Sequence, residues 1–341
     1  MIPLVTIKLT SMLLRFLNER GMSLGKSFYI FMGVFMYNKG HENVEGLIKI
    51  FLDRGMLIND VEKAKRSLSH INYYKIKEFA QPFFKNHMYK NITFEEIIAR
   101  FYFDKKLRVH LLHSIEEIEL SFKTKLAYIL GKKHGAFGYL SFNNWCNKKE
   151  YCKYYIRDKE KETKKYIKML ISRGDNPIIK KFFSENPDCE YPPIWMLIEI
   201  LSFGETLKLY ELMSIKNKED IADFYSCYPN ELESWLKSLK FIRNLSAHNT
   251  NIIDNRLITN AIIRKDWKQY LYIHPKTGKV TNRVAVIIII LIYMMKKINP
   301  NYKIWKFKDV FKNLFNNSDN LANKYGFANK SLQIFDRNFV L

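Results

Sequence analysis

The sequence predicts an all-α fold, organised as a helical bundle, on three observations. From residue 44 onward, apolar residues recur at intervals of three and four, which is the period of an amphipathic helix. The strand–helix–strand alternation that is typical of a parallel sheet is absent from the sequence. The chain of 341 residues is 47% hydrophobic, which allows a sizeable core and excludes a disordered chain.

Residues 44–91 are expected to form a small helical N-terminal unit, preceded by an extension over residues 1–43. Its first helix ends near Gly55, because glycine is a favoured residue at a helix C-terminus. Two further helices are predicted over residues 61–68 and 73–84.

Residues 92–300 are predicted to form the main helical core. Thr93 and Glu96 have the spacing of a capping box, so a helix should begin there. The apolar pattern then continues as far as Gly131, which is long for one helix. We therefore expect either a break near Asp104 or two helices that meet end to end.

The second half of this core is less regular. Residues 135–192 contain several Gly, Pro and Asn residues, and we expect an inserted segment that packs beside the core. Helical periodicity returns over residues 195–213 and 232–247, and the second of these helices should begin near Pro229. His274 to Gly278 predicts a turn or the tip of a short hairpin.

Residues 284–298 form the last strongly predicted helix, and residues 301–341 are expected to be a basic C-terminal tail. A membrane-spanning helix needs about 20 apolar residues, whereas the apolar runs at 28–37 and 284–295 are shorter. We therefore expect a buried helix at 284–298 and no stable membrane insertion.

The charge of the chain indicates a polyanionic partner. It has 56 Lys and Arg residues against 34 Asp and Glu residues, which gives a net charge of +22. Nucleic acid and an anionic membrane surface are the two candidates. Four cysteines without paired spacing predict a reducing compartment, the cytoplasm, and no zinc site. Phosphate-binding glycine motifs are absent, and we expect neither a metal nor another cofactor.

One segment, KFIRNLSAHN at residues 240–249, combines residues suited to RNA chemistry: Arg243, Asn244 and His248. A guanidinium binds phosphate and stays charged, and an imidazole can remove and return a proton. Arg108 and His113 share the same spacing, so the spacing alone is weak evidence. On a regular helix, two residues five positions apart point about 140° away from each other. The pair would therefore have to straddle a helix end, at the turn predicted over residues 249–251. The alternative is an exposed arginine and a histidine favoured by the helix dipole.

Several blocks of sequence, in order, resemble the bacterial abortive-infection AbiD/AbiF-like family. They are FLDRGMLINDVEKAKRSLSHINYYKIKEFAQPFF at 51–84, FEEIIARFYFDKKLRVHLLHSIEEIELSFKTKLAYILGKKHG at 94–135 and PPIWMLIEILSFGETLKLY at 192–210. FIRNLSAHN at 241–249 resembles the R-x4-6-H signature of the HEPN superfamily, to which this family belongs. The resemblance covers about residues 44–265. Lys123 departs from it, because the family commonly has arginine there.

The resemblance implies a HEPN-type helical core, a role in phage defence or toxicity, and metal-independent RNA cleavage. It also implies a homodimer with a composite site. Carried over by position, Arg243 and His248 match the signature, and Asn244 matches its polar second residue.

Other charged residues are candidates for supporting roles. Asp104 with Arg108, and Glu119 with Lys123, have the spacing of ion pairs on a helix surface. The alternative is that these residues, with Glu116, support the Arg243–His248 pair. A basic and aromatic run at residues 148–168 could bind RNA, or could be an ordinary solvated helix face, since acidic residues dilute it. Its candidate RNA-binding residues are Lys148, Lys149, Lys153, Arg157, Lys164 and Lys165.

Three functions are therefore open. The first is an antiphage endoribonuclease in which His248 is the acid/base and Arg243 binds the phosphate. The second is a non-catalytic RNA-binding component of a toxin–antitoxin-like defence system, with a regulatory or antitoxin RNA as its partner. The third is a membrane-perturbing effector that uses residues 28–37.

Overall fold

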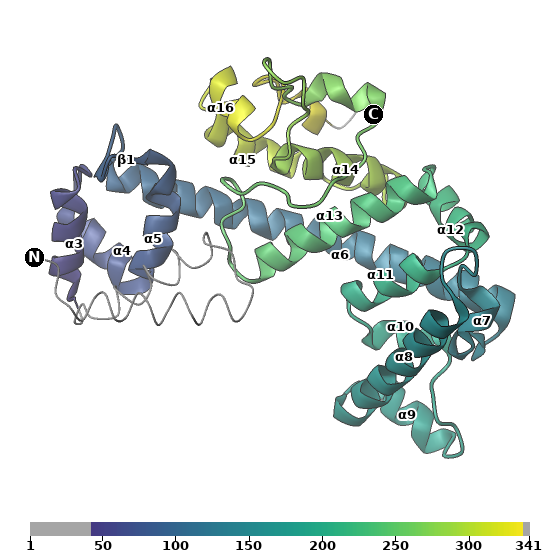
Figure 1. The fold of residues 1–341 in the computed structure, drawn as a ribbon. Coiled ribbons are helices and arrows are strands. Elements are labelled where there is room, and N and C mark those ends of the chain that lie inside the picture. Colours follow the sequence, from purple (N-terminus) through teal and green to yellow (C-terminus); the bar gives the residue numbers. More distant parts are fainter. Residues whose placement is uncertain (1–41, 337–341) are drawn as a thin grey trace, which may run out of the picture. The chain divides into compact units, whose positions relative to one another are not determined.

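The computed structural model describes residues 42–336 (Figure 1), and the chain divides into two compact units between Glu96 and Ile97. The expected extension over residues 1–43, with the apolar run at 28–37, falls almost entirely outside the described residues. The described chain is mainly helical, with one two-stranded sheet, and the all-α prediction is confirmed.

The first unit contains the three predicted helices, α3 (Val44–Asp53), α4 (Val61–His70) and α5 (Tyr73–Ala80). Each begins at an Asn or Asp whose side chain accepts a hydrogen bond from a backbone N–H of the first turn. Phe51 is fully buried among aromatic rings, with its ring centroid 5.0 Å from that of Tyr73 and 5.7 Å from that of Phe94.

A small hairpin follows these helices, where the sequence predicted only the end of a helix. Strands β1 (Phe84–Lys85) and β2 (Met88–Tyr89) pair antiparallel. Asn86 and His87 form the turn with φ of 50° and 63°. Two residues with positive φ form the tight turn whose twist matches that of paired strands.

Helix α6 (Phe94–His134) is continuous over 41 residues, so the expected break near Asp104 is wrong. The capping box is confirmed, because the Thr93 N–H donates to the Glu96 carboxylate and the Glu96 N–H donates to the Thr93 hydroxyl. The helix continues because its apolar positions stay on one buried face throughout. Eight of them are fully inaccessible: Ile97, Leu107, Leu111, Ile115, Ile118, Phe122, Leu126 and Leu130.

The segment between α6 and the later core helices is itself helical. It contains α7 (Phe142–Trp145), α8 (Lys153–Arg173) and α9 (Pro177–Glu185). The run predicted at 195–213 is two helices, α10 (Ile194–Ile200) and α11 (Phe203–Leu212). The chain turns between them because Ser202 is extended and caps α11 by accepting the N–H of Glu205.

Helices α12 (Ile215–Ala222), α13 (Pro229–Ala247) and α14 (Val284–Ile298) follow, and α13 packs against α11, α12 and α14 (Figure 1). Residues 284–295 of α14 are all buried, which confirms the buried helix. Among residues 42–336, no helix has both the length and the apolar character needed to cross a membrane. The predicted hairpin tip is confirmed, because His274 and Lys279 are joined by a backbone hydrogen bond of 2.9 Å.

The expected C-terminal tail is folded as far as the structure describes it. It contains α15 (Lys306–Phe315) and α16 (Asp319–Lys324). Its aromatic residues form a buried cluster, which is why the segment packs despite its lysines: Phe307, Phe311, Phe315, Phe327 and Phe335. Short 3-10 turns occupy Gln81–Phe83, Gly138–Leu140, Asp223–Tyr225, Lys265–Tyr270 and Gln333–Phe335.

Candidate active site at the end of helix α13

Arg243 and His248 lie at the C-terminal end of α13. Arg243 is in the last helical turns, and His248 is the residue that ends the helix, with its N–H donating to the carbonyl oxygen of Asn244 at 3.0 Å. Asn249 follows with φ of 57°, a left-handed conformation that stops a helix and that asparagine tolerates. The two residues therefore straddle a helix end. Both are accessible, since the Arg243 side chain is 42% exposed and His248 is exposed.

The guanidinium of Arg243 has two neighbours. Its Nε lies 3.9 Å from Oε2 of Glu119, and its Nη1 donates to the side-chain oxygen of Asn244 at 3.4 Å. Glu119 also pairs with Lys123, one turn further along α6, at 3.0 Å. Both of those side chains are only 14% exposed. Glu119 therefore places a mostly buried carboxylate beside the exposed arginine, and Lys123 balances part of its charge.

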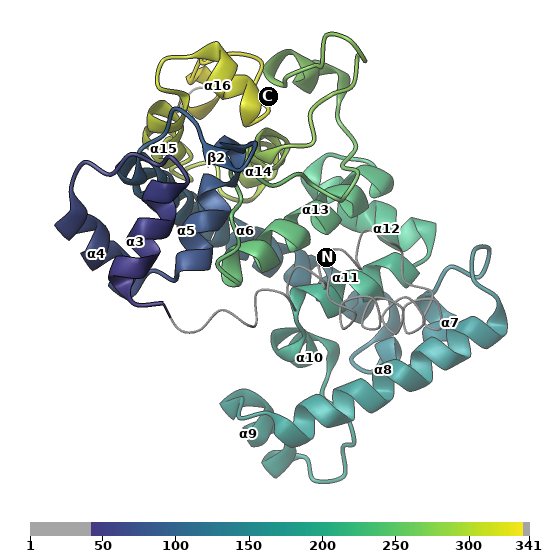
Figure 2. The ribbon, with the colours of Figure 1, turned by 60° about the vertical axis from the view of Figure 1, so that its left-hand side comes forward.

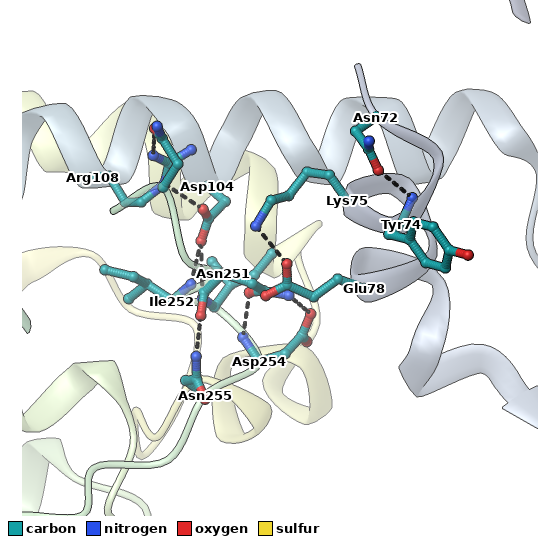
Figure 3. A network of polar contacts seen from close by, with 12 residues as sticks. Asn72, Tyr74, Lys75, Glu78, Asp104, Arg108, Asn251, Ile252, Asp254 and Asn255 are labelled. Atoms are coloured by element: carbon teal, nitrogen blue, oxygen red, sulfur yellow. Dashed lines mark hydrogen bonds and ion pairs between the residues drawn. The ribbon is translucent and has the colours of Figure 1, made fainter. Parts of the chain in front are cut away.

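The chain that follows His248 is held by a buried ion pair on α6 (Figure 3). Asp104 accepts Nε of Arg108 at 2.7 Å through one oxygen, and the backbone N–H groups of Ile252 and Ile253 at 2.7 and 3.1 Å through the other. Arg108 donates from Nη1 to the side-chain oxygen of Asn249 at 2.7 Å. The pair predicted as a helix-surface salt bridge is thus buried, and it joins α6 to the segment next to His248.

The buried position of this pair has an electrostatic consequence. The Asp104 side chain is fully inaccessible and that of Arg108 is 5% exposed. Burial raises the pKa of Asp104 above its ordinary value, although the two backbone N–H groups and Arg108 act in the opposite direction. A buried carboxylate with this many donors fixes the backbone that it binds, so the pair restricts where the turn after α13 can lie.

A second set of contacts holds the same segment, and the sequence did not reveal it. Asn251 and Asp254 bond to each other through side chain and backbone at 2.8 and 3.1 Å. Arg100 donates to Asp254 at 2.7 Å and to the hydroxyl of Tyr325 at 3.2 Å. The spacing of the sequence could have indicated this role for Arg100, because Arg100 lies one turn before Asp104 on the same face of α6.

A family model described as Abi-like protein matches residues 66–254. This match covers more than half of the chain, and it includes α6, α13 and the segment that Asp104 holds. The chain belongs to the Abi-like protein family. Comparisons with curated proteins and with solved structures found no match. The predicted abortive-infection family is thereby confirmed, and membership in the Abi-like family points to abortive infection, a form of antiphage defence.

Within this Abi-like chain, the second Arg–His spacing on α6 is not a matching pair. Arg108 is buried against Asp104, whereas His113 is exposed and its ring lies 5.6 Å from that of Tyr302. Glu116, a predicted supporting residue, is exposed and forms no ion pair in the described part of the chain. Of the four predicted supporting residues, Glu119 contacts Arg243, and Asp104 with Arg108 holds the adjacent loop.

The predicted RNA-binding residues belong to α8 and to the segment before it, not to α13. Lys148 and Lys149 precede α8, and the others lie on α8 itself. Lys164 is paired with Glu160 at 2.7 Å, so its charge is locally neutralised. Over residues 42–336, no cluster of three or more His, Cys, Asp or Glu side chains is arranged to hold a metal ion.

Proposed function

We propose that this protein is an abortive-infection endoribonuclease of HEPN type that cleaves RNA without a metal. The observation that carries the proposal is the placement of Arg243 and His248. Both reach solvent at one helix end, whereas the turn that follows them is fixed by buried contacts to α6. A rigid support beneath exposed reactive side chains is what an active site requires.

The proposed reaction is a transfer of the phosphodiester within the RNA. His248 removes the proton of a ribose 2′-hydroxyl, whose oxygen attacks the adjacent phosphorus. The bond to the 5′-oxygen of the next nucleotide breaks, and that oxygen receives a proton from an imidazolium. Arg243 binds the phosphate oxygens, where negative charge increases in the transition state. The products are a 2′,3′-cyclic phosphate and a free 5′-hydroxyl.

A second copy of the chain would complete the site. The sequence resemblance implies a composite site across a homodimer, in which two His248 side chains face one bound strand. The exposure of Arg243 and His248 supports this arrangement, because both side chains remain accessible to a partner.

The test compares His248→Ala and Arg243→Ala with His113→Ala, a matched control at an exposed histidine of the same unit. Loss of a general acid/base lowers the rate by about 10²–10⁴-fold, and loss of a group that stabilises transition-state charge lowers it by about 10²–10³-fold. His248→Ala and Arg243→Ala should therefore both lose cleavage of labelled RNA in the presence of EDTA. The control should cleave like the wild type. Unchanged cleavage and unchanged host toxicity in the first two variants would refute the proposal.

The same assay decides the alternative function. The net charge of +22 and the exposed cations of α8 favour RNA binding with or without catalysis. If wild-type protein binds labelled RNA tightly and leaves it intact, the protein is the RNA-binding component of a defence system, with a regulatory or antitoxin RNA as its partner.

A further inference from the structure

The outer face of α8 carries a regular row of positive charges. Four cations lie one helical turn apart, and we call them the α8 stripe: Lys153, Arg157, Lys161 and Lys165. All four side chains are exposed, and none forms an ion pair within residues 42–336. Figure 2 shows α8 along its length, with α7 near one end and α9 near the other. Lys161 was missed by the sequence prediction.

The other lysines of this helix differ from the stripe. Lys159 pairs with Glu162 at 2.6 Å, Lys164 pairs with Glu160, and Lys168 pairs with Glu190. The sequence argument that acidic residues dilute the charge therefore applies to these lysines and not to the stripe. Asp158 lies beside the stripe, is exposed, and forms no ion pair with it. Four uncompensated charges thus remain on one face.

The spacing of the stripe suits an extended polyanion. With a rise of 1.5 Å per residue, successive members lie about 6 Å apart and the row is about 18 Å long. Proteins that bind single strands use such basic tracks for the backbone and exposed aromatic rings for the bases. Tyr154 supplies such a ring, since it is 79% exposed and lies one turn before Arg157 and Asp158.

An anionic membrane is a weaker match to this helix. A membrane-surface helix places an exposed apolar face next to its cations. The aliphatic residues Ile156 and Ile167 of α8 are instead buried at 2% and 1% exposure. Tyr154 and Tyr155 are the large apolar side chains that the helix exposes.

We propose that the α8 stripe, with Tyr154, is a docking surface for single-stranded RNA, separate from Arg243 and His248. The four cations bind backbone phosphates, and the tyrosine stacks on a base. This inference rests on the proposed function only in taking RNA as the partner. Binding is therefore measured apart from cleavage, so that either proposal can fail alone.

The experiment measures the anisotropy of a fluorescein-labelled single-stranded RNA of mixed sequence, with the full chain carrying His248→Ala. The stripe variant adds Lys153→Gln, Arg157→Gln, Lys161→Gln and Lys165→Gln. The matched control replaces four ion-paired lysines by glutamine: Lys159, Lys164, Lys168 and Lys180. Both variants lose four positive charges, and their thermal unfolding is compared to confirm that both fold.

Each phosphate contact on a single strand contributes about 0.7 to the slope of log Kobs against log salt. Between about 50 and 200 mM salt, the slope of the stripe variant should therefore be smaller in magnitude than the slope of the His248→Ala parent by about 3. The control variant should have the same slope as the parent. Tyr154→Ala should weaken binding about tenfold with the slope unchanged.

Equal slopes in the stripe variant and the control would overturn the proposal, because general charge would then explain the binding. Unchanged RNA binding with lost flotation on phosphatidylserine vesicles would overturn it in favour of a membrane. If the stripe dependence is found and the wild-type protein does not cleave RNA, the docking surface stands and the nuclease proposal fails.

Discussion

The chemistry of Asp104 depends on its surroundings, because burial raises its pKa above the ordinary value. It is fully inaccessible and accepts hydrogen bonds from Arg108 and from two backbone N–H groups. Asp104→Ala should lower the free energy of unfolding by about 3–5 kcal/mol, because it leaves a buried guanidinium without its partner. Asp104→Asn should cost less, since an amide oxygen still accepts a hydrogen bond. Urea denaturation of both variants measures the difference.

Asp158→Ala is the control for this prediction, since that carboxylate is exposed and unpaired in the described part of the chain. Its unfolding free energy should stay within about 0.5 kcal/mol of the wild type. If Asp104→Ala is as stable as Asp158→Ala, the buried pair does not hold the segment after His248.

At the scale of one element, α13 is fixed at its first turn as well as at its last. The Glu231 carboxylate accepts the N–H of Tyr228 at 2.9 Å and two N–H groups of Arg264 at 2.9 and 2.8 Å. Arg264 also lies over the ring of Tyr293, 4.4 Å from its centroid. Burial by itself would raise the pKa of Glu231, but the bonds from Arg264 and from the Tyr228 N–H lower it below the ordinary value.

A carboxyl whose pKa is lower in the folded state adds stability above its unfolded pKa. That stability is lost as the pH falls through the folded value. Glu231→Gln should therefore unfold more easily than the wild type at neutral pH, by about 1–3 kcal/mol. The difference should shrink in acid, as the wild-type carboxyl becomes protonated. Denaturant titrations of Glu231→Gln and the wild type, from neutral to acid pH, measure this difference. Glu219→Gln, at an exposed glutamate, is the control. A difference that does not change with pH would contradict this account.

At the scale of the whole molecule, the proposed composite site predicts that activity depends on the association of two chains. If two chains are needed, the specific RNA cleavage activity should fall when the protein is diluted below its dimer dissociation constant. Sedimentation velocity over the same concentrations should show the shift from dimer to monomer. Constant specific activity across that shift would show that one chain carries a complete site.

The sequence by itself determined the helices of the N-terminal unit and the main helices of the core, because helix signals are local. The periods of three and four, the capping box at Thr93 and Glu96, and Pro229 gave elements that the structure contains. The burial of α14 followed from a run apolar on every face. The end of α13 at His248 followed from the turn residues after it.

The tertiary structure decided those features that depend on contacts between distant parts of the chain. Asp104 and Arg108 have the spacing of a surface pair, and they are buried because residues 249–253 fold over them with hydrogen bonds that compensate the charge. Contacts with distant segments likewise decided that α6 continues without a break and that the residues beyond 301 pack as a folded segment. Local spacing fixes which side chains share a helix face, but the partner that covers that face comes from a distant part of the chain.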